Sequence, residues 1–168
     1  QEFDDKRLGA RSNYIYAEGE LKHLQMLPWD FKFLSRLSGQ MADAQLISNE
    51  QFTAGGVGSV RGYHQTQQLG DDGVAYSAEL YTPNLRKAEW DWMQQWRFLA
   101  FAEAAKLWIH RPLSGTPSGY SLASFGTGMR VQLFKHLSSE LDWSYPLIRS
   151  DTVDVGQQRI DFSLIYDF

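Results

Sequence analysis

Apolar and polar residues alternate along most of this chain. An alternation with a period of two is typical of β-strands that turn one face to an apolar environment and the other to a polar one. In residues 121–134, for example, Phe125 and Met129 share one face, and Gly128 and Arg130 share the other. The pattern predicts seven strands, at 14–26, from 29 to a loop that starts near 42, and at 73–82, 93–108, 121–134, 138–147 and 160–168.

Residues 93–108 fit two patterns. They contain helix formers such as Ala104 and Lys106, and at a period of 3.6 they form a passable amphipathic helix. At a period of two, Phe98 and Ala100 lie on the face opposite Arg97. We choose a strand, because the neighbouring segments are strands and an isolated helix would interrupt the meander.

The polar faces of the hairpins predict charge contacts between neighbouring strands. Arg130 is placed to meet Asp142 or Glu140 across its hairpin. The first hairpin is expected to bring two acidic residues near two basic ones, namely Glu18 and Glu20 near Lys32 and Arg36. Taken alone, that hairpin fits a soluble sheet with one wet face equally well.

The predicted strands are long. Most of them have roughly 9 to 14 residues, near or above the length that a tilted strand needs to cross a bilayer, whereas soluble strands average about 5 to 6. Short and long connections alternate, and aromatic residues lie near the strand ends of the apolar faces, as in an interfacial girdle. The fold class is therefore all-β, a transmembrane antiparallel β-barrel. Seven strands would leave two open edges, so we expect the chain to be part of a larger barrel.

The composition is compatible with this interpretation and indicates no nucleic-acid partner and no cysteine-based site. The 168 residues include 16 basic and 20 acidic side chains, a net charge of -4 without a long basic run, so nucleic acid is not expected as a partner. Cysteine is absent, which excludes disulfides and thiolate metal sites. The chain does not begin with Met, and we expect it to be an internal or C-terminal piece of a longer protein.

The longest predicted connection, about 42–70, carries the most unusual stretch of the sequence. Within QFTAGGVGSVRGY, Gly55 and Gly56 precede a motif formed by Val60, Arg61, Gly62 and Tyr63. A flexible loop that presents a guanidinium between strands is expected to deliver Arg61 to acidic groups in a polar interior. The alternative is a solvated arginine in an ordinary surface turn. A nucleotide cradle is not expected, because the glycines do not match GxGxxG and no Lys-Ser/Thr pair follows.

No catalytic or metal-binding pattern emerges from the remaining residues. A GxSxG nucleophile elbow is absent, and the four histidines have neither metal-ligand nor triad spacing. Turn chemistry and a polar lumen account for the carboxylate pairs Asp71-Asp72 and Glu18/Glu20. We therefore predict no enzyme activity, no cofactor and no metal.

Residues 40–80, with the VRGY core between a double glycine and a Gly-Asp, strongly resemble the outer-membrane transporters of two-partner secretion, the haemolysin and adhesin activation/secretion proteins. The stretch ASFGTGMR at 123–130 and the terminal aromatic are similar to this family as well. The resemblance implies a bacterial outer-membrane barrel of sixteen strands preceded by periplasmic POTRA domains. This chain would then supply the last seven strands, with the loop at about 42–70 entering from the extracellular side and folded into the lumen.

The resemblance also implies roles for individual residues. In the family the loop arginine contacts an acidic residue of a Phe-x-Asp motif on the inner wall, which corresponds here to Phe101-Ala102-Glu103. Glu103 is thus the expected partner of Arg61, with Glu79 as the fallback. The terminal Phe168 and Tyr166 resemble the signal by which such barrels are recognised for insertion, although a plain last strand would show the same pattern.

The function implied is passage of an unfolded secreted polypeptide, with outer-membrane lipid and the barrel assembly machinery as further partners. We expect mixed charges to line the lumen, namely Glu20, Lys32, Arg36, Glu79, Arg97, Glu103, Arg130 and Asp142. Two alternatives stay open. One is a barrel of the same superfamily that inserts other outer-membrane proteins, and the other is a soluble β-rich binding module.

Overall fold

The computed structural model describes residues 14–168, so the first 13 residues of the predicted barrel segment lie outside the described part. Seven strands form one antiparallel sheet in sequence order. The strands are β1 (Tyr16–Met26), β2 (Lys32–Ala42), β5 (Asp72–Tyr81), β6 (Met93–Trp108), β7 (Gly119–Leu133), β8 (Leu137–Pro146) and β9 (Arg159–Tyr166). The seven predicted strands are confirmed, including the choice of a strand over a helix for 93–108.

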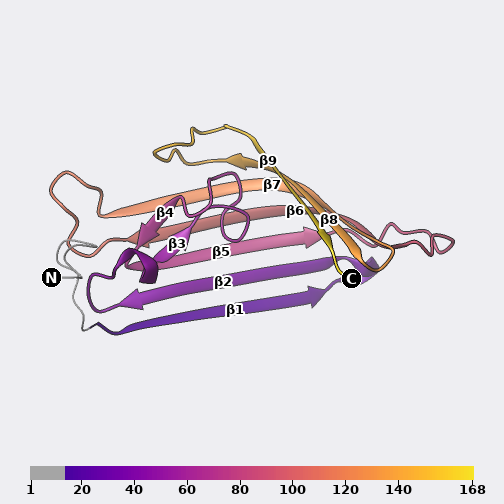
Figure 1. Ribbon diagram of the computed structural model, residues 1–168, viewed down its shortest axis with the longest axis horizontal. Helices are drawn as coiled ribbons and strands as arrows, with labels where there is room; N and C mark the ends of the chain where they lie inside the picture. The colour runs from indigo at the N-terminus through magenta and orange to yellow at the C-terminus, as the bar shows by residue number, and fades with distance from the viewer. Residues whose placement is uncertain (1–13) are drawn as a thin grey trace.

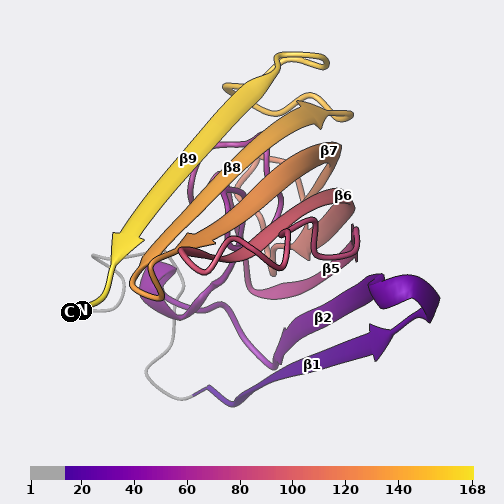
Figure 2. The ribbon, with the colours of Figure 1, turned by 90° about the vertical axis from the view of Figure 1, so that its right-hand side faces the viewer.

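The sheet is a curved, open trough with β1 and β9 at its two edges (Figures 1 and 2). The connections 27–31, 82–92 and 134–136 and the C-terminus lie at one end, which we call the turn end. The connections 43–71, 109–118 and 147–158 lie at the opposite end, the loop end. The first of these contains a 3-10 turn, η2 (Ser48–Glu50), and a small two-stranded sheet, β3 (Phe52–Ala54) and β4 (Gln68–Gly70), which the sequence pattern did not predict.

Burial alternates along β6 as the sequence pattern requires. Even-numbered residues from Phe98 to Trp108 are exposed on the convex face, and odd-numbered residues from Arg97 to Leu107 are buried on the concave face. The register extends this division to the neighbours, since Glu103 pairs with Ser77 on one side and with Ser124 on the other. The convex face is rich in exposed apolar residues, including Tyr76, Leu80, Phe125, Leu141, Ile160, Phe162 and Leu164.

Aromatic side chains gather at the turn end. Trp90 lies near both Trp92 and Trp96, with ring centroids 5.8 and 6.4 Å apart, and the contacts continue to Phe98 and Phe134. This arrangement agrees with the girdle expected from the sequence. Within residues 14–168, no helix has the length and apolar character required to cross a membrane.

Two details of the first hairpin were predicted wrongly. The second strand begins at Lys32 instead of Trp29, because Trp29 and Asp30 have φ values of 59° and 63° and turn the chain in η1 (Pro28–Asp30). The register also places none of the expected charge partners directly opposite one another, and only Glu20 and Arg36 are diagonal neighbours. Lys22, which is basic, lies opposite Arg36, while the two glutamates face uncharged residues, with Glu18 paired to Gln40 and Glu20 to Ser38.

Candidate functional site

The connection between β2 and β5 folds back onto the concave face of the sheet (Figures 1 and 2). We call residues 43–71 the Arg61 loop. It shares one buried apolar cluster with the inner wall, formed by Phe52, Ala54, Val60, Tyr63, Ala75, Ala105, Leu107, Leu122 and Val153. Phe52 packs so closely on Gly73 that a Cβ at residue 73 would lie 2.1 Å from its ring. The loop is therefore packed into the trough like part of a core.

The glycines around Arg61 allow a backbone path that other residues disfavour. Gly55, Gly56 and Gly62 have φ values of 111°, 89° and 93°. Gly62 also runs along β8, where a Cβ would touch Ser144 at 3.4 Å. Side chains at Gly55 or Gly56 would collide with residues 64–67 of the returning loop. These glycines let the loop double back and bring Arg61 against the wall.

Arg61 is bound chiefly by Glu103. The backbone N–H of Arg61 donates to Oε2 of Glu103 at 2.7 Å, and Nε of Arg61 donates to Oε1 at 2.9 Å. Nη2 donates to the same Oε1. Both side chains are about 3% exposed, so solvent screens this ion pair weakly. Glu103, which stands where the resemblance implies a shorter Asp, thus contacts the backbone and the guanidinium of Arg61 together.

Two further carboxylates complete the surroundings of Arg61. Nη2 of Arg61 also donates to Oε1 of Glu79, and Nη1 donates to Oδ2 of Asp142 at 3.3 Å. Glu79 is held in turn by the hydroxyl of Tyr81. Arg130 donates to Oδ1 and Oδ2 of Asp142 at 2.7 and 2.9 Å. We call Arg61 with Glu79, Glu103 and Asp142 the clasp. Glu79, the fallback partner, and Glu103 both bind Arg61.

An aromatic platform and two glycines shape the clasp. The guanidinium carbon of Arg61 lies 3.5 Å from the centre of the Phe101 ring, a cation–π distance. A Cβ at Gly126 would lie 2.4 Å from that ring, and a Cβ at Gly128 would lie 2.0 Å from Oδ1 of Asp142. The two glycines of β7 therefore recess the wall beneath Phe101 and the Asp142 carboxylate.

The electrostatics keep Arg61 charged. Burial alone would lower the pKa of the guanidinium, but the hydrogen bonds and charge of Glu103, together with Glu79 and Asp142, offset that effect and raise the pKa of Arg61 above its usual value. A permanently charged group in a shielded site needs its anions in place. The clasp can therefore hold the loop as an ion-pair latch.

Tyr63 adds a second attachment next to Arg61. Its hydroxyl oxygen lies 2.8 Å from the backbone oxygens of both Ala123 and Ile148, which share its single donor proton, and it accepts from the N–H of Ile148 at 3.2 Å. These groups lie where β7 and β8 separate at the loop end. Val60 and Tyr63 are fully buried on either side of the Arg61-Gly62 pair. All four residues of the VRGY motif thus contact or face the wall.

Comparison with known proteins decides the family. The sequence profile described as haemolysin secretion/activation protein ShlB/FhaC/HecB matches residues 4–131, more than half of the chain. The chain belongs to this family. Members of the ShlB/FhaC/HecB family are outer-membrane transporters of Gram-negative bacteria, and the predicted outer-membrane location is confirmed. A soluble binding module does not fit that location.

A solved structure has the same fold. CdiB from Acinetobacter baumannii superposes with a TM-score of 0.65 at 19% sequence identity, over 91% of this chain and 27% of that one. At this identity the match shows the fold alone. The present chain thus spans about a quarter of the length of CdiB. No curated protein matches the chain.

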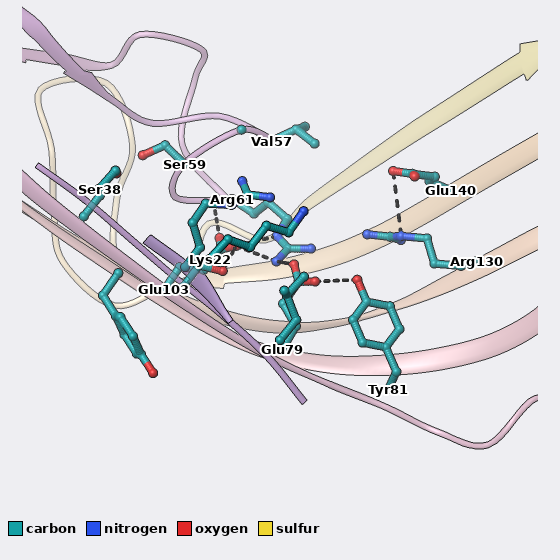
Figure 3. A pocket seen from close by; sticks show the side chains of 16 residues that line it. Lys22, Ser38, Val57, Ser59, Arg61, Glu79, Tyr81, Glu103, Arg130 and Glu140 are labelled. Atoms are coloured by element: carbon teal, nitrogen blue, oxygen red, sulfur yellow. Dashed lines mark hydrogen bonds and ion pairs between the residues drawn. The ribbon is translucent and has the colours of Figure 1, made fainter. Parts of the chain in front are cut away.

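A polar cavity of about 270 Å³ adjoins the clasp of this ShlB/FhaC/HecB member (Figure 3). Several of the charges predicted to line a lumen face it, namely Arg36, Glu79, Glu103 and Arg130, together with Lys22, Tyr81 and Glu140. The predicted contact between Arg130 and the acids of β8 is present, to Asp142 and, at 3.7 Å, to Glu140. Ser59 and Val57 of the Arg61 loop form another part of the lining.

Arg97 and Asp30 lie away from the clasp, at the turn end. Nη2 of Arg97 donates to Oδ2 of Asp30 at 2.6 Å, and Nη1 donates to the backbone oxygen of Asp30 at 2.9 Å. The pKa of Asp30 is lowered, chiefly by the hydrogen bond from the backbone N–H of Asn84 and secondly by the hydrogen bond and charge of Arg97. This group joins the connections at the turn end and does not contact Arg61.

Sequence reasoning missed the role of Asp71. Its side chain is fully buried and accepts hydrogen bonds from the backbone N–H groups of Leu46 and His110 at 2.9 and 2.8 Å, and from Gln51 at 3.2 Å. Asp71 thus joins the two stems of the Arg61 loop to the end of β6. The Gly-Asp that follows the VRGY motif was the available signal, but the Asp71-Asp72 pair was attributed to turn chemistry and a polar lumen.

The remaining predicted residues lie at the C-terminus. Tyr166 ends β9 and stacks on Phe168, whose side chain is fully exposed beyond the strand. Phe168 and the Arg61 loop lie at opposite ends of the sheet, as strand parity requires. The role of Tyr166 and Phe168 as an insertion signal stays a prediction. Within residues 14–168, no cluster of three or more His, Asp or Glu side chains is arranged to hold a metal ion.

Proposed function

We propose that the full-length protein translocates an unfolded partner polypeptide of the haemolysin or adhesin type across the outer membrane, in two-partner secretion. This chain would form the last seven strands of a sixteen-stranded barrel that follows periplasmic POTRA domains. The observation that carries the proposal is the clasp, which docks the Arg61 loop on the inner wall of a membrane sheet. Family membership supports the same function.

The mechanism needs no covalent step. The Arg61 loop occupies the concave side of the sheet, where the polypeptide would pass, and the clasp sets its position. Passage therefore depends on where the loop lies, and folding of the polypeptide outside the cell supplies direction. The mixed charges around the cavity, among them Lys22, Glu79 and Arg130, offer hydrogen-bonding groups without a single dominant sign.

The outer surfaces suggest the other partners. The exposed apolar residues of the convex face would contact outer-membrane lipid. The last strand, with Ile160, Phe162, Leu164 and Tyr166 exposed along one side, would be recognised by the barrel assembly machinery. Both contacts are part of the proposal.

A double-mutant cycle in the full-length transporter tests the function. Arg61→Ala, Glu103→Ala and the double variant are compared by secreted passenger per folded transporter in the outer membrane. A charge swap is less informative, because a glutamate at position 61 would still face Glu79 and Asp142. We expect each single variant to reduce secretion and the double variant to lose little more, since both remove the same contact.

The control is Glu20→Gln, which removes a carboxylate from the same face of β1, opposite Ser38. It should secrete as the unmodified protein does. Normal secretion by Arg61→Ala would refute the role of the loop. Loss of other outer-membrane proteins, with passenger secretion unaffected, would instead support an assembly barrel of the same superfamily.

A further inference from the structure

The connection between β8 and β9, residues 147–158, lies against the Arg61 loop. Four polar contacts join the two segments. Two of them are between side chains, from Thr152 to Gln67 at 3.0 Å and from Gln68 to Asp151 at 3.4 Å. The others join Tyr63 to the backbone N–H and C=O of Ile148. The loop therefore touches the sheet on one side and this connection on the other.

Val153 is the apolar centre of that contact. It is 3% exposed and belongs to the buried cluster that contains Val60 and Tyr63, the residues that flank Arg61-Gly62. Ser150 turns the connection inward, since its backbone N–H donates to the oxygen of Val153 and its hydroxyl accepts from the N–H of Val153. A valine on a loop between two strands is thus as buried as the wall residues.

The neighbouring connection does not behave in this way. Residues 111–118, between β6 and β7, are all exposed. Within 147–158 itself, Val155 is 55% exposed only two residues from Val153. Burial of Val153 is therefore a specific feature of this position and does not follow from loop length or composition.

We propose that Val153 is a positioning residue for the clasp. By filling the cluster beside Val60 and Tyr63, it holds the VRGY backbone at the depth at which Arg61 reaches Glu103. The Arg61 loop is then held from two sides, by the ion pairs of Arg61 with the wall and by the apolar contact of Val153 at the loop end. The importance of this latch for transport rests on the proposed function, but the latch itself does not.

A consequence concerns the order of events. The 147–158 connection contacts the loop at the loop end, and Val153 shares a buried cluster with it, so the loop can leave the trough only if these contacts break or the connection moves with it. Undocking requires the connection to move away or to move together with the loop. Displacement of Val153 should accordingly expose the loop even when Arg61 and its three carboxylates are all present.

The test uses a single cysteine, because this chain contains none. Ser59 is suitable, since its hydroxyl is buried beside Arg61 and has no hydrogen-bond partner within the described residues. The full-length transporter carries Ser59→Cys, with cysteines elsewhere replaced by serine, and the rate of maleimide labelling in outer membranes reports exposure of the loop. Val153→Asp is compared with the matched variant Val155→Asp.

We expect Val153→Asp to raise the labelling rate by about 10- to 100-fold, because a carboxylate is strongly disfavoured in an apolar cluster. Val155→Asp should leave the rate within about twofold, as is usual for an exposed position. Val153→Ala should give an intermediate rate at unchanged barrel level, which protects the test against a variant that fails to fold. Equal rates for the Val153 and Val155 variants would overturn the proposal.

Secretion is measured in parallel. Faster labelling with reduced secretion supports both the positioning role and the proposed function. Faster labelling of both Val153→Asp and Arg61→Ala with normal secretion keeps the positioning role and refutes the function. The two proposals therefore fail in distinguishable ways.

Discussion

Glu103 should contribute more than any other carboxylate to holding the Arg61 loop. It accepts the backbone N–H, Nε and Nη2 of Arg61, whereas Glu79 accepts only Nη2, and Asp142 lies 3.3 Å from Nη1. Asp142 is also engaged by Arg130. Glu103→Gln should therefore release the loop most strongly, followed by Glu79→Gln and Asp142→Asn.

The magnitude follows from the burial of the pair. Loss of one partner from a buried ion pair costs about 3 to 5 kcal/mol, because the other charge is left without compensation. Glu79 and Asp142 still face Arg61 in the Glu103→Gln variant, so the lower part of that range applies. At about 1.4 kcal/mol for each factor of ten, the undocked fraction should rise by roughly two orders of magnitude. Loss of one charged hydrogen bond, as in Glu79→Gln, costs about 1.5 to 3 kcal/mol.

The assay is the labelling rate of Ser59→Cys in outer membranes, with passenger secretion per folded barrel as the second readout. Glu20→Gln serves as the control, since it removes a carboxylate from the same face without touching Arg61. The expected order of labelling is Glu103→Gln, Glu79→Gln and then the control. Should Glu103→Gln label no faster than Glu20→Gln, the clasp would not be what holds the loop.

Two further variants probe the parts that support the clasp. Gly128→Ala should reduce secretion several-fold, because the added Cβ would lie 2.0 Å from the Asp142 carboxylate and displace it. Thr127→Ala, on the exposed face, should not reduce secretion. Equal secretion by the two variants would refute the idea that the clasp needs a glycine at position 128. Tyr63→Phe keeps the buried ring but removes the hydroxyl bound to Ala123 and Ile148, at a cost of about 1 to 3 kcal/mol, so Ser59→Cys should label faster than in the unmodified protein and more slowly than with Arg61→Ala. Labelling of Tyr63→Phe at the unmodified rate would show that the hydroxyl is dispensable.

The strands could be predicted from the sequence because each depends on a local pattern. A period of two decides which residues of β6 face the trough, and the pattern held even where alanines favoured a helix. The turn at Trp29 escaped the same reasoning, because two successive residues with positive φ leave no mark on an apolar–polar alternation. The turn at Pro28–Asp30 sets the register of the first hairpin, and this register places Lys22 opposite Arg36.

The site could be predicted only in part, for a related reason. A motif pointed to Arg61 and Glu103, but the third carboxylate lies on β8, and its distance from Arg61 depends on how far the sheet curves. Asp142 was therefore predicted as a lumen charge and as one of two possible partners of Arg130, but not as a partner of Arg61. The glycines of β7 were placed correctly on the inner face, yet their role depends on Phe101 and Asp142, which lie on the two neighbouring strands.

The charges of the clasp limit how the loop can leave. Two guanidiniums, Arg61 and Arg130, face three shielded carboxylates. If Arg61 departs, Asp142 keeps Arg130 and Glu79 keeps the Tyr81 hydroxyl, but among residues 14–168 Glu103 retains only a 3.3 Å contact from Ser77. A carboxylate with so little compensation is costly unless water or another cation reaches it. Undocking of the Arg61 loop should therefore be coupled to the arrival of water or a cation at Glu103, which the adjoining polar cavity can supply because Glu103 lines it.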